Sequence, residues 1–167
     1  MKRIHVLGTA GLTLWLTGCA SAPVVLAPIG PNPAGSADAA TDGRLEVYSA
    51  LEGRSEGNNP AWYQPTGYDL CDAHGKPICH VNNTTGNYAR SPRPLALPAG
   101  KYLVKAQGKA DQWLEVPVWI EHGRTTRIHL ADGWKPPPQT SPTQLVFAPP
   151  HDPVGWCPQP AGDVGMN

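Results

Sequence analysis

A strict alternation of apolar and polar residues is the feature that most constrains the fold of this chain. Residues 113–121, WLEVPVWIE, place four aliphatic side chains on one face and the remaining residues on the other. Residues 44–51, 101–106 and 125–131 follow the same period of two, which is typical of half-buried strands. No segment shows the repeat of an amphipathic helix. The pattern therefore predicts an all-β sandwich of at least five short strands.

Two glycines indicate where strands turn. Residues 68–82 are predicted to form a hairpin with Gly75 in the left-handed conformation and a bulge after it. Residues 113–121 and 125–131 are predicted to form a second hairpin, with Gly123 left-handed. A three-residue loop sets Val118 opposite Thr126 in that hairpin, which keeps both apolar faces on the same side.

Proline and glycine, 20 and 18 residues, crowd the two ends of the chain. Residues 44–131 are therefore predicted to form one domain. A segment of this size can enclose one hydrophobic core and no more. Residues 19–43 are expected to be a flexible tether, with an edge strand at 24–26 as the less favoured alternative. Residues 132–167 are expected to be a Pro-rich tail, docked in part through the apolar QLVFA of 144–148.

The N-terminus has the features of a secretory signal. Lys2 and Arg3 precede an apolar run that is too short to span a bilayer. Leu16, Thr17, Gly18 and Cys19 resemble the lipobox of bacterial lipoproteins. That resemblance implies removal of residues 1–18 and lipidation of Cys19, and several acyl chains on one residue anchor a protein stably. Ala20 and Ser21 after the cysteine imply an outer-membrane destination facing the periplasm. The alternative is an ordinary secretory signal that happens to contain a cysteine.

Charge and motifs exclude several classes of function. Without Lys2 and Arg3, 11 basic and 13 acidic residues remain, which argues against binding nucleic acid or gripping anionic lipid electrostatically. The sequence has no nucleophile elbow, phosphate-binding loop or zincin motif, so we expect no enzyme and no cofactor. The histidines have no recognisable ligand spacing, so no metal site is expected.

Three cysteines remain after Cys19. Cys71 and Cys79 flank the first predicted hairpin, and an oxidising compartment favours disulfides. In a bulged three-residue loop the two share a face but sit diagonally, beyond ordinary disulfide reach, whereas a five-residue loop brings them opposite each other. A Cys71–Cys79 bond is one alternative. A bond from Cys157 to either residue is the other.

Tryptophan offers a candidate binding surface. Trp113 and Trp119 lie on the face of 113–121 that is opposite the aliphatic stripe. If that face is exposed, the two indoles form a platform for a glycan or a protein partner. The favoured alternative is that the Pro-rich tail covers them.

The run LPAGKYLVKA at 97–106, the apolar strand after it, the Gly turn and TTRIHL at 125–130 together resemble the transthyretin-like modules labelled carboxypeptidase regulatory-like or PEGA-like. YDLCDAHGKP at 68–77 fits the same pattern. The resemblance covers residues 44–131 and implies an accessory, adhesive or scaffold module without common catalytic residues. We therefore expect a non-enzymatic cell-envelope lipoprotein with an envelope protein partner. The alternatives are a carbohydrate-binding module and, less favoured, an inhibitor or chaperone of another envelope protein.

Overall fold

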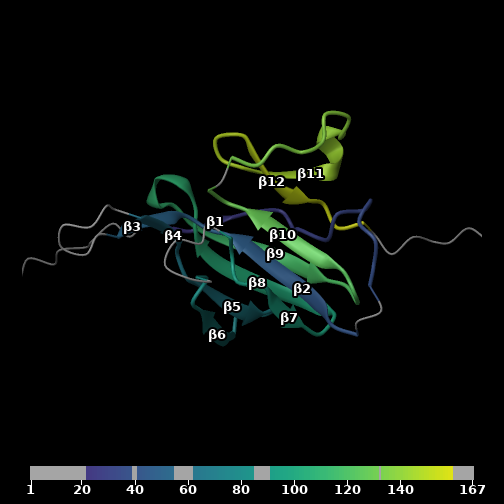
Figure 1. The fold of residues 1–167 in the computed structure, drawn as a ribbon, viewed down its shortest axis with the longest axis horizontal. Helices are drawn as coiled ribbons and strands as arrows, with labels where there is room; N and C mark the ends of the chain where they lie inside the picture. The colour runs from purple at the N-terminus through teal and green to yellow at the C-terminus, as the bar shows by residue number, and fades with distance from the viewer. Residues whose placement is uncertain (1–21, 39–40, 55–61, 85–90, 132, 160–167) are drawn as a thin grey trace, which may run out of the picture.

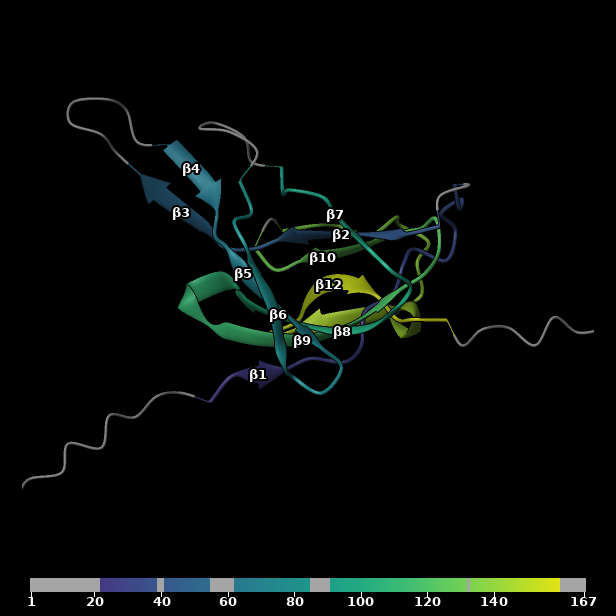
Figure 2. The same cartoon turned by 90° about the horizontal axis from the view of Figure 1, so that it is seen from below.

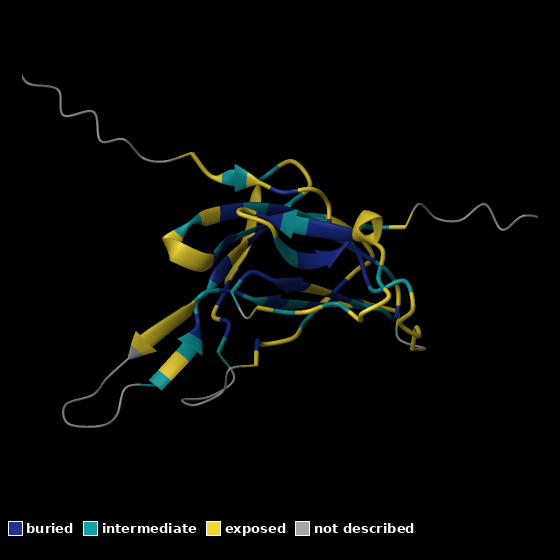
Figure 3. Cartoon of the chain, turned by 90° about the horizontal axis from the view of Figure 1, so that it is seen from above, coloured by how far each residue is buried: buried dark blue, intermediate teal, exposed yellow. Residues whose placement is uncertain are grey.

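Two β-sheets face each other and enclose a single apolar core (Figures 2 and 3). The structure, a computed structural model, describes residues 22–38, 41–54, 62–84, 91–131 and 133–159. The predicted signal peptide, the lipobox and Cys19 lie outside the described residues. Within these ranges the expected all-β class is confirmed. The only helical elements described are two 3-10 turns, Lys109–Asp111 and Pro142–Gln144. None of the described helices has the length and apolar character needed to cross a membrane.

The larger sheet has five strands in the order β1-β9-β8-β5-β6. Antiparallel pairing joins β9, β8, β5 and β6, while β1 runs parallel to β9. The strands are β1 (Val24–Val25), β9 (Trp113–Ile120), β8 (Gly100–Gln107), β5 (Tyr68–Asp72) and β6 (Pro77–Val81). The aliphatic stripe of β9 is buried on the inner face, as the alternation predicts.

The smaller sheet has three strands in the order β10-β2-β7: β10 (Thr125–His129), β2 (Gly43–Tyr48) and β7 (Leu95–Leu97). Strand β10 runs parallel to β2, and β7 runs antiparallel to it. Two further hairpins extend from the sandwich: β3 (Leu51–Arg54) with β4 (Trp62–Pro65), and β11 (Leu145–Ala148) with β12 (Asp152–Trp156). Figure 1 shows these hairpins at different places on the body.

The predicted hairpin of 113–121 with 125–131 is wrong. Strand β9 pairs with β8 in one sheet, and β10 pairs with β2 in the other, so the chain crosses between sheets at Gly123. Gly123 does have the expected left-handed conformation, with φ of 64°. Either arrangement keeps both apolar stripes inside. The crossing sets the two stripes face to face rather than side by side, and it lets each strand pair along its full length with another partner.

The described part of the predicted tether is held on the sandwich instead, and Val24–Val25 form an edge strand, in line with the less favoured alternative at 24–26. Leu26 donates its N–H to the carbonyl of Glu115 at 2.9 Å, and Ile29 donates to that of Pro117 at 2.9 Å. Ile29 is completely buried. Strand β9 would otherwise be a free sheet edge, and the apolar residues of 24–29 pair with it and extend the core. The stretch from Val25 to Ile29 contains one residue more than the stretch of β9 with which it pairs. The extra residue lies at the level of Pro117, whose nitrogen cannot donate a hydrogen bond.

The C-terminal segment is docked as a hairpin. Strands β11 and β12 pack against β10 and the 29–31 segment, at the side of the sandwich where the two sheets would otherwise open (Figure 1). Val146, Ala148 and Val154 join the common core. The folded body therefore extends from about Val24 to Cys157, beyond the predicted 44–131, because both flanking segments supply core residues.

Candidate functional site

Four rings on the outer side of the smaller sheet form a continuous aromatic array. The imidazole of His129 stacks between Tyr48 and Trp134, with ring centroids 4.6 Å away on each side. Trp134 then meets Trp156 edge to face at 5.9 Å. Trp134 is just past β10 and Trp156 ends β12, so the array fastens the Pro-rich segment to the sandwich.

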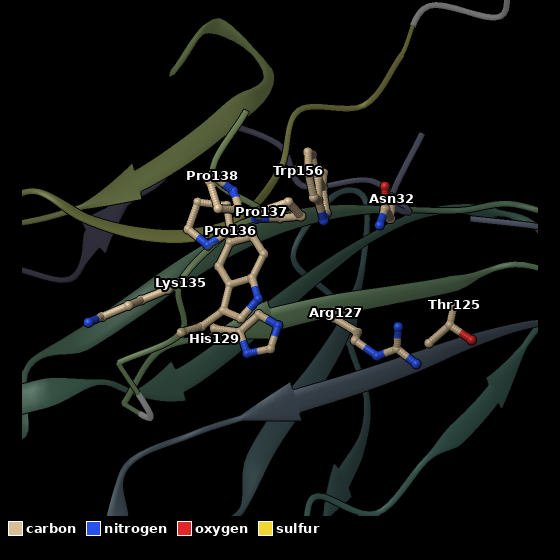
Figure 4. Close-up of a pocket in the computed structure, with 10 residues that line it drawn as sticks. Asn32, Thr125, Arg127, His129, Lys135, Pro136, Pro137, Pro138 and Trp156 are labelled. Atoms are coloured by element: carbon tan, nitrogen blue, oxygen red, sulfur yellow. The ribbon is translucent and has the colours of Figure 1, made fainter. Parts of the chain in front are cut away.

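A groove lies beside this array, with a volume of about 540 Å³. Pro136, Pro137 and Pro138 form one wall, while Thr125 and Arg127 project from β10 on the other (Figure 4). A second hollow of about 250 Å³ shares Asn32, Thr125 and Arg127 with it and continues toward Gly35. Together they make an open channel with proline and indole surfaces on one side and polar groups on the other.

The channel is lined by basic side chains and by no carboxylate of the described residues. Arg124, Arg127 and Lys135 contribute to its walls. Two of these charges are balanced from outside it. Arg127 donates to Glu46 at 2.7 Å and Arg124 donates to Glu121 at 2.7 Å. The channel thus combines apolar rings with cationic and hydrogen-bonding side chains.

Sequence reasoning did not identify this channel. Its walls come from three separate segments: residues 31–36, strand β10 and the 134–138 run. The segment GWKPPP was assigned to the Pro-rich tail and not to a binding site on the sandwich. Its composition could have indicated a channel wall, because an indole and three prolines around a single lysine form a stiff apolar strip.

The two tryptophans predicted as a platform both lie on the outer face of the larger sheet. Trp113 is 54% exposed, while Trp119 is half-buried with the Lys101 ammonium 4.6 Å from its ring centroid. Six residues along a strand separate them by about 20 Å. The Lys105–Glu115 ion pair, at 2.9 Å, lies between. The predicted cover by the tail is wrong for Trp113, because the tail docks on β10 instead. The two indoles are too far apart to stack on one sugar.

The three described cysteines are free thiols, and the predicted disulfides are absent. Cys71 pairs with Pro77, and a bulge sets Cys79 opposite Leu70. Opposed residues share a face, so the Cys79 thiol lies on the Leu70 side of the sheet and the Cys71 thiol on the other. Cys71 is buried, Cys79 is exposed and Cys157 packs against the core. Burial raises the pKa of the Cys71 thiol.

The charged residues near the first hairpin belong to its turn. The Asp72 carboxylate accepts from the N–H groups of Lys76 and His74, each at 2.9 Å, and these bonds lower the pKa of Asp72. His80 and Asp69 pair at 2.7 Å on the outer face. Over the described ranges, no cluster of three or more His, Cys, Asp or Glu side chains has the geometry to hold a metal ion.

No protein-family model, curated protein sequence or solved structure matches the chain.

Proposed function

We propose that this chain is a non-enzymatic cell-envelope lipoprotein, anchored through Cys19 and holding a β-sandwich as an accessory or interaction module. The observation that carries the proposal is the direct connection between the lipobox-like motif and the folded body. Val24, five residues after Cys19, already pairs with Leu114 of β9. An anchor and a compact module are thus joined with almost no spacer. By the lipobox resemblance the address is the outer membrane, facing the periplasm.

The channel beside Trp134 supports a binding role for the module. Its walls combine apolar rings with hydrogen-bonding groups from Asn32, Thr125 and Arg127. Concave surfaces of this composition are typical of binding sites. An envelope protein is the partner that we propose for it. The transthyretin-like resemblance points to the same kind of accessory role.

Anchoring is tested by metabolic labelling with palmitate. The wild-type chain is expected to incorporate label and to fractionate with membranes, and Cys19→Ala is expected to lose both. Labelling that persists in Cys19→Ala contradicts the anchor. An ordinary secreted protein would show neither label nor membrane fractionation in the wild type.

The binding role is tested by photo-crosslinking in intact cells. A photoreactive residue in place of Lys135, at the channel wall, is expected to capture a discrete envelope protein. The matched control replaces Ala73, an exposed residue in the β5–β6 turn, and is expected to capture none. Equal capture from both positions, or none from residue 135, contradicts the channel as the contact site.

A carbohydrate-binding role is the second candidate, and the exposure of Trp113 favours it. Retention on isolated peptidoglycan sacculi tests it directly. Binding that falls in Trp113→Ala but persists in Trp119→Ala would support a single-indole glycan contact. Absence of retention, or retention unchanged in the double variant, removes this candidate.

A further inference from the structure

Exposed apolar side chains gather at one end of the sandwich. In the described part of the chain, the exposed large apolar residues are Val25, Leu51, Tyr63, Ile78 and Trp113. All of these except Ile78 lie at the end where the N-terminal segment enters. Figures 1 and 2 show the start of β1 and the β3–β4 hairpin at this same end.

Backbone pairing links the segments that carry these residues. Val24 pairs with Leu114, the neighbour of Trp113, and Val25 shares the outer face of the sheet with Trp113. Trp113 pairs in turn with Gln107, whose carbonyl accepts the N–H of Ala50 at 2.8 Å. Ala50 is directly followed by Leu51. The edge of the larger sheet and the base of the β3–β4 hairpin therefore adjoin at this end of the sandwich, where Figure 2 shows β1 and the hairpin toward its two opposite sides.

The hairpin presents its apolar side in a defined way. Leu51 pairs with Pro65 and Gly53 with Tyr63, so these four residues share one face. The Tyr63 ring covers Gly53, where an added Cβ would lie 3.3 Å from the ring. The ring is nevertheless 51% exposed. Together with Trp113, it gives this end two amphipathic aromatic side chains.

The short chain between Cys19 and β1 limits how far this surface can lie from the membrane. Five Cα-to-Cα steps separate Cys19 from Val24, which is at most about 18 Å when fully extended. The headgroup layer on each side of a bilayer is about 6 Å thick. An acylated Cys19 would therefore hold this end of the sandwich at the membrane surface.

We propose that the end surface formed by Val25, Leu51, Tyr63 and Trp113 rests in the lipid–water interface of the membrane that holds Cys19. This inference rests on the proposed function, because the anchor supplies the proximity. Trp and Tyr are the side chains that favour this interface, since their apolar bodies and polar tips match its two sides. The module is thus a body seated on the membrane with a fixed orientation, not one held at a distance.

Charge indicates the kind of lipid contact. Lys109, in the turn before β9, pairs with Asp152 at 2.8 Å, and Asp111 accepts from Gln107 in the same turn. The described residues of this surface include no basic cluster for anionic headgroups. The contact is apolar and aromatic, and it therefore depends little on ionic strength.

Quenching of tryptophan emission by brominated acyl chains tests the proposal. Full-length lipidated protein is reconstituted in phosphatidylcholine vesicles with and without dibrominated lipid, and palmitate labelling is measured on the same preparation. The wild type is expected to be quenched, and Trp113→Phe is expected to lose at least half of that quenching. The matched control, Trp119→Phe, replaces an indole on the same face but farther from the anchor and is expected to retain it.

The outcomes separate the surface from the anchor. Palmitate-labelled protein without bromine quenching, or with quenching equal in wild type and Trp113→Phe, overturns the membrane contact and leaves the lipoprotein proposal standing. Absence of palmitate overturns both. Retention on sacculi that depends on Trp113 assigns the surface to a glycan and overturns the lipid contact. Quenching that is lost in Trp113→Phe supports the membrane contact if it is also unchanged in about 0.5 M salt, where surface charges are largely screened.

Discussion

Ile29 occupies the space that a side chain at Gly155 would need. A Cβ added at residue 155 would lie 2.7 Å from Ile29 Cγ2 and 3.1 Å from the carbonyl oxygen of Arg127. The N-terminal segment, strand β10 and the C-terminal hairpin therefore meet at one point. The carbonyl of Trp156 accepts the N–H of Gly30 at 2.8 Å beside it. This meeting point holds both ends of the described chain on the sandwich.

Gly155→Val is expected to destabilise the fold and loosen the C-terminal hairpin. The added side chain overlaps Ile29 and backbone, neither of which has room to move, and such overpacking costs about 1–3 kcal/mol. Urea denaturation gives the free energy of unfolding, and limited proteolysis reports cleavage in the 133–159 segment. Gly100→Ala is the control, because its nearest neighbour atom would be an ordinary 3.5 Å away. Equal effects of the two substitutions would contradict the packing described.

Asn83 is a buried polar residue beside strand β2. Its side chain is completely buried and donates to the Val47 carbonyl at 2.6 Å and to Ser49 Oγ at 3.0 Å. Its oxygen accepts the N–H of Arg93 at 3.1 Å. The amide thus ties β2 to the two stretches that flank residues 85–90.

Asn83→Ala is expected to lower the free energy of unfolding by about 2–4 kcal/mol, because it removes the three hydrogen bonds of a buried amide. The neighbouring Asn82 is exposed, so Asn82→Ala is expected to change stability by less than about 0.5 kcal/mol. Chemical denaturation of both variants measures the difference. Similar stability of the two would show that the amide network contributes little.

Short-range patterns in the sequence predicted the strands better than their partners. Alternation located the strand at 113–120 and its buried face, and the left-handed glycines 75 and 123 were found from turn chemistry. The pairing of strands was harder to predict, because β9 buries its apolar face equally well beside β10 in one sheet or opposite it in the other. Parity is the same in both arrangements, so it does not distinguish a hairpin from a crossing between sheets.

The N-terminal segment and the channel could not be predicted for a related reason, because both depend on contacts between residues far apart in the sequence. Residues 24–29 are apolar but include Pro28, and it is the free edge of β9 that pairs with Val24–Val25 and with Ile29. The channel needs residues 31–36, β10 and 134–138 at once, and no local pattern connects them. The cysteine pairing depended on a single-residue bulge opposite Leu70, which composition does not specify.

Thiol reactivity should separate the first-hairpin cysteines. Cys79 is exposed on the edge strand β6, whereas Cys71 is buried and its pKa is raised, which keeps the thiol protonated and unreactive. A maleimide probe is expected to label Cys79 rapidly in the folded protein and Cys71 only after unfolding. Mass spectrometry of peptides measures the order. Cys79→Ser removes the fast phase and serves as control. Protection of both thiols until a reductant is added would instead establish a disulfide.

Tyr68 should make stability fall at alkaline pH. Its side chain is 1% exposed and its hydroxyl has no hydrogen-bond partner among the described residues. Burial raises the pKa of this phenol far above its ordinary value of about 10. Above pH 10 the unfolded chain loses this proton while the folded chain keeps it. The unfolded state then binds fewer protons, so stability is full below about pH 10 and declines as pH rises further.

Tyr68→Phe removes both the unpaired hydroxyl and this titration. The variant is expected to be as stable as wild type at pH 7, or more stable by up to about 1 kcal/mol, since a buried donor without a partner is costly. Between about pH 10 and 12 its stability is expected to decline less steeply than that of wild type. Denaturation midpoints across this range measure both effects. Tyr63→Phe, at an exposed side chain, is the matched control. A loss of about 1 kcal/mol or more in Tyr68→Phe at pH 7 would mean that the hydroxyl has a partner after all.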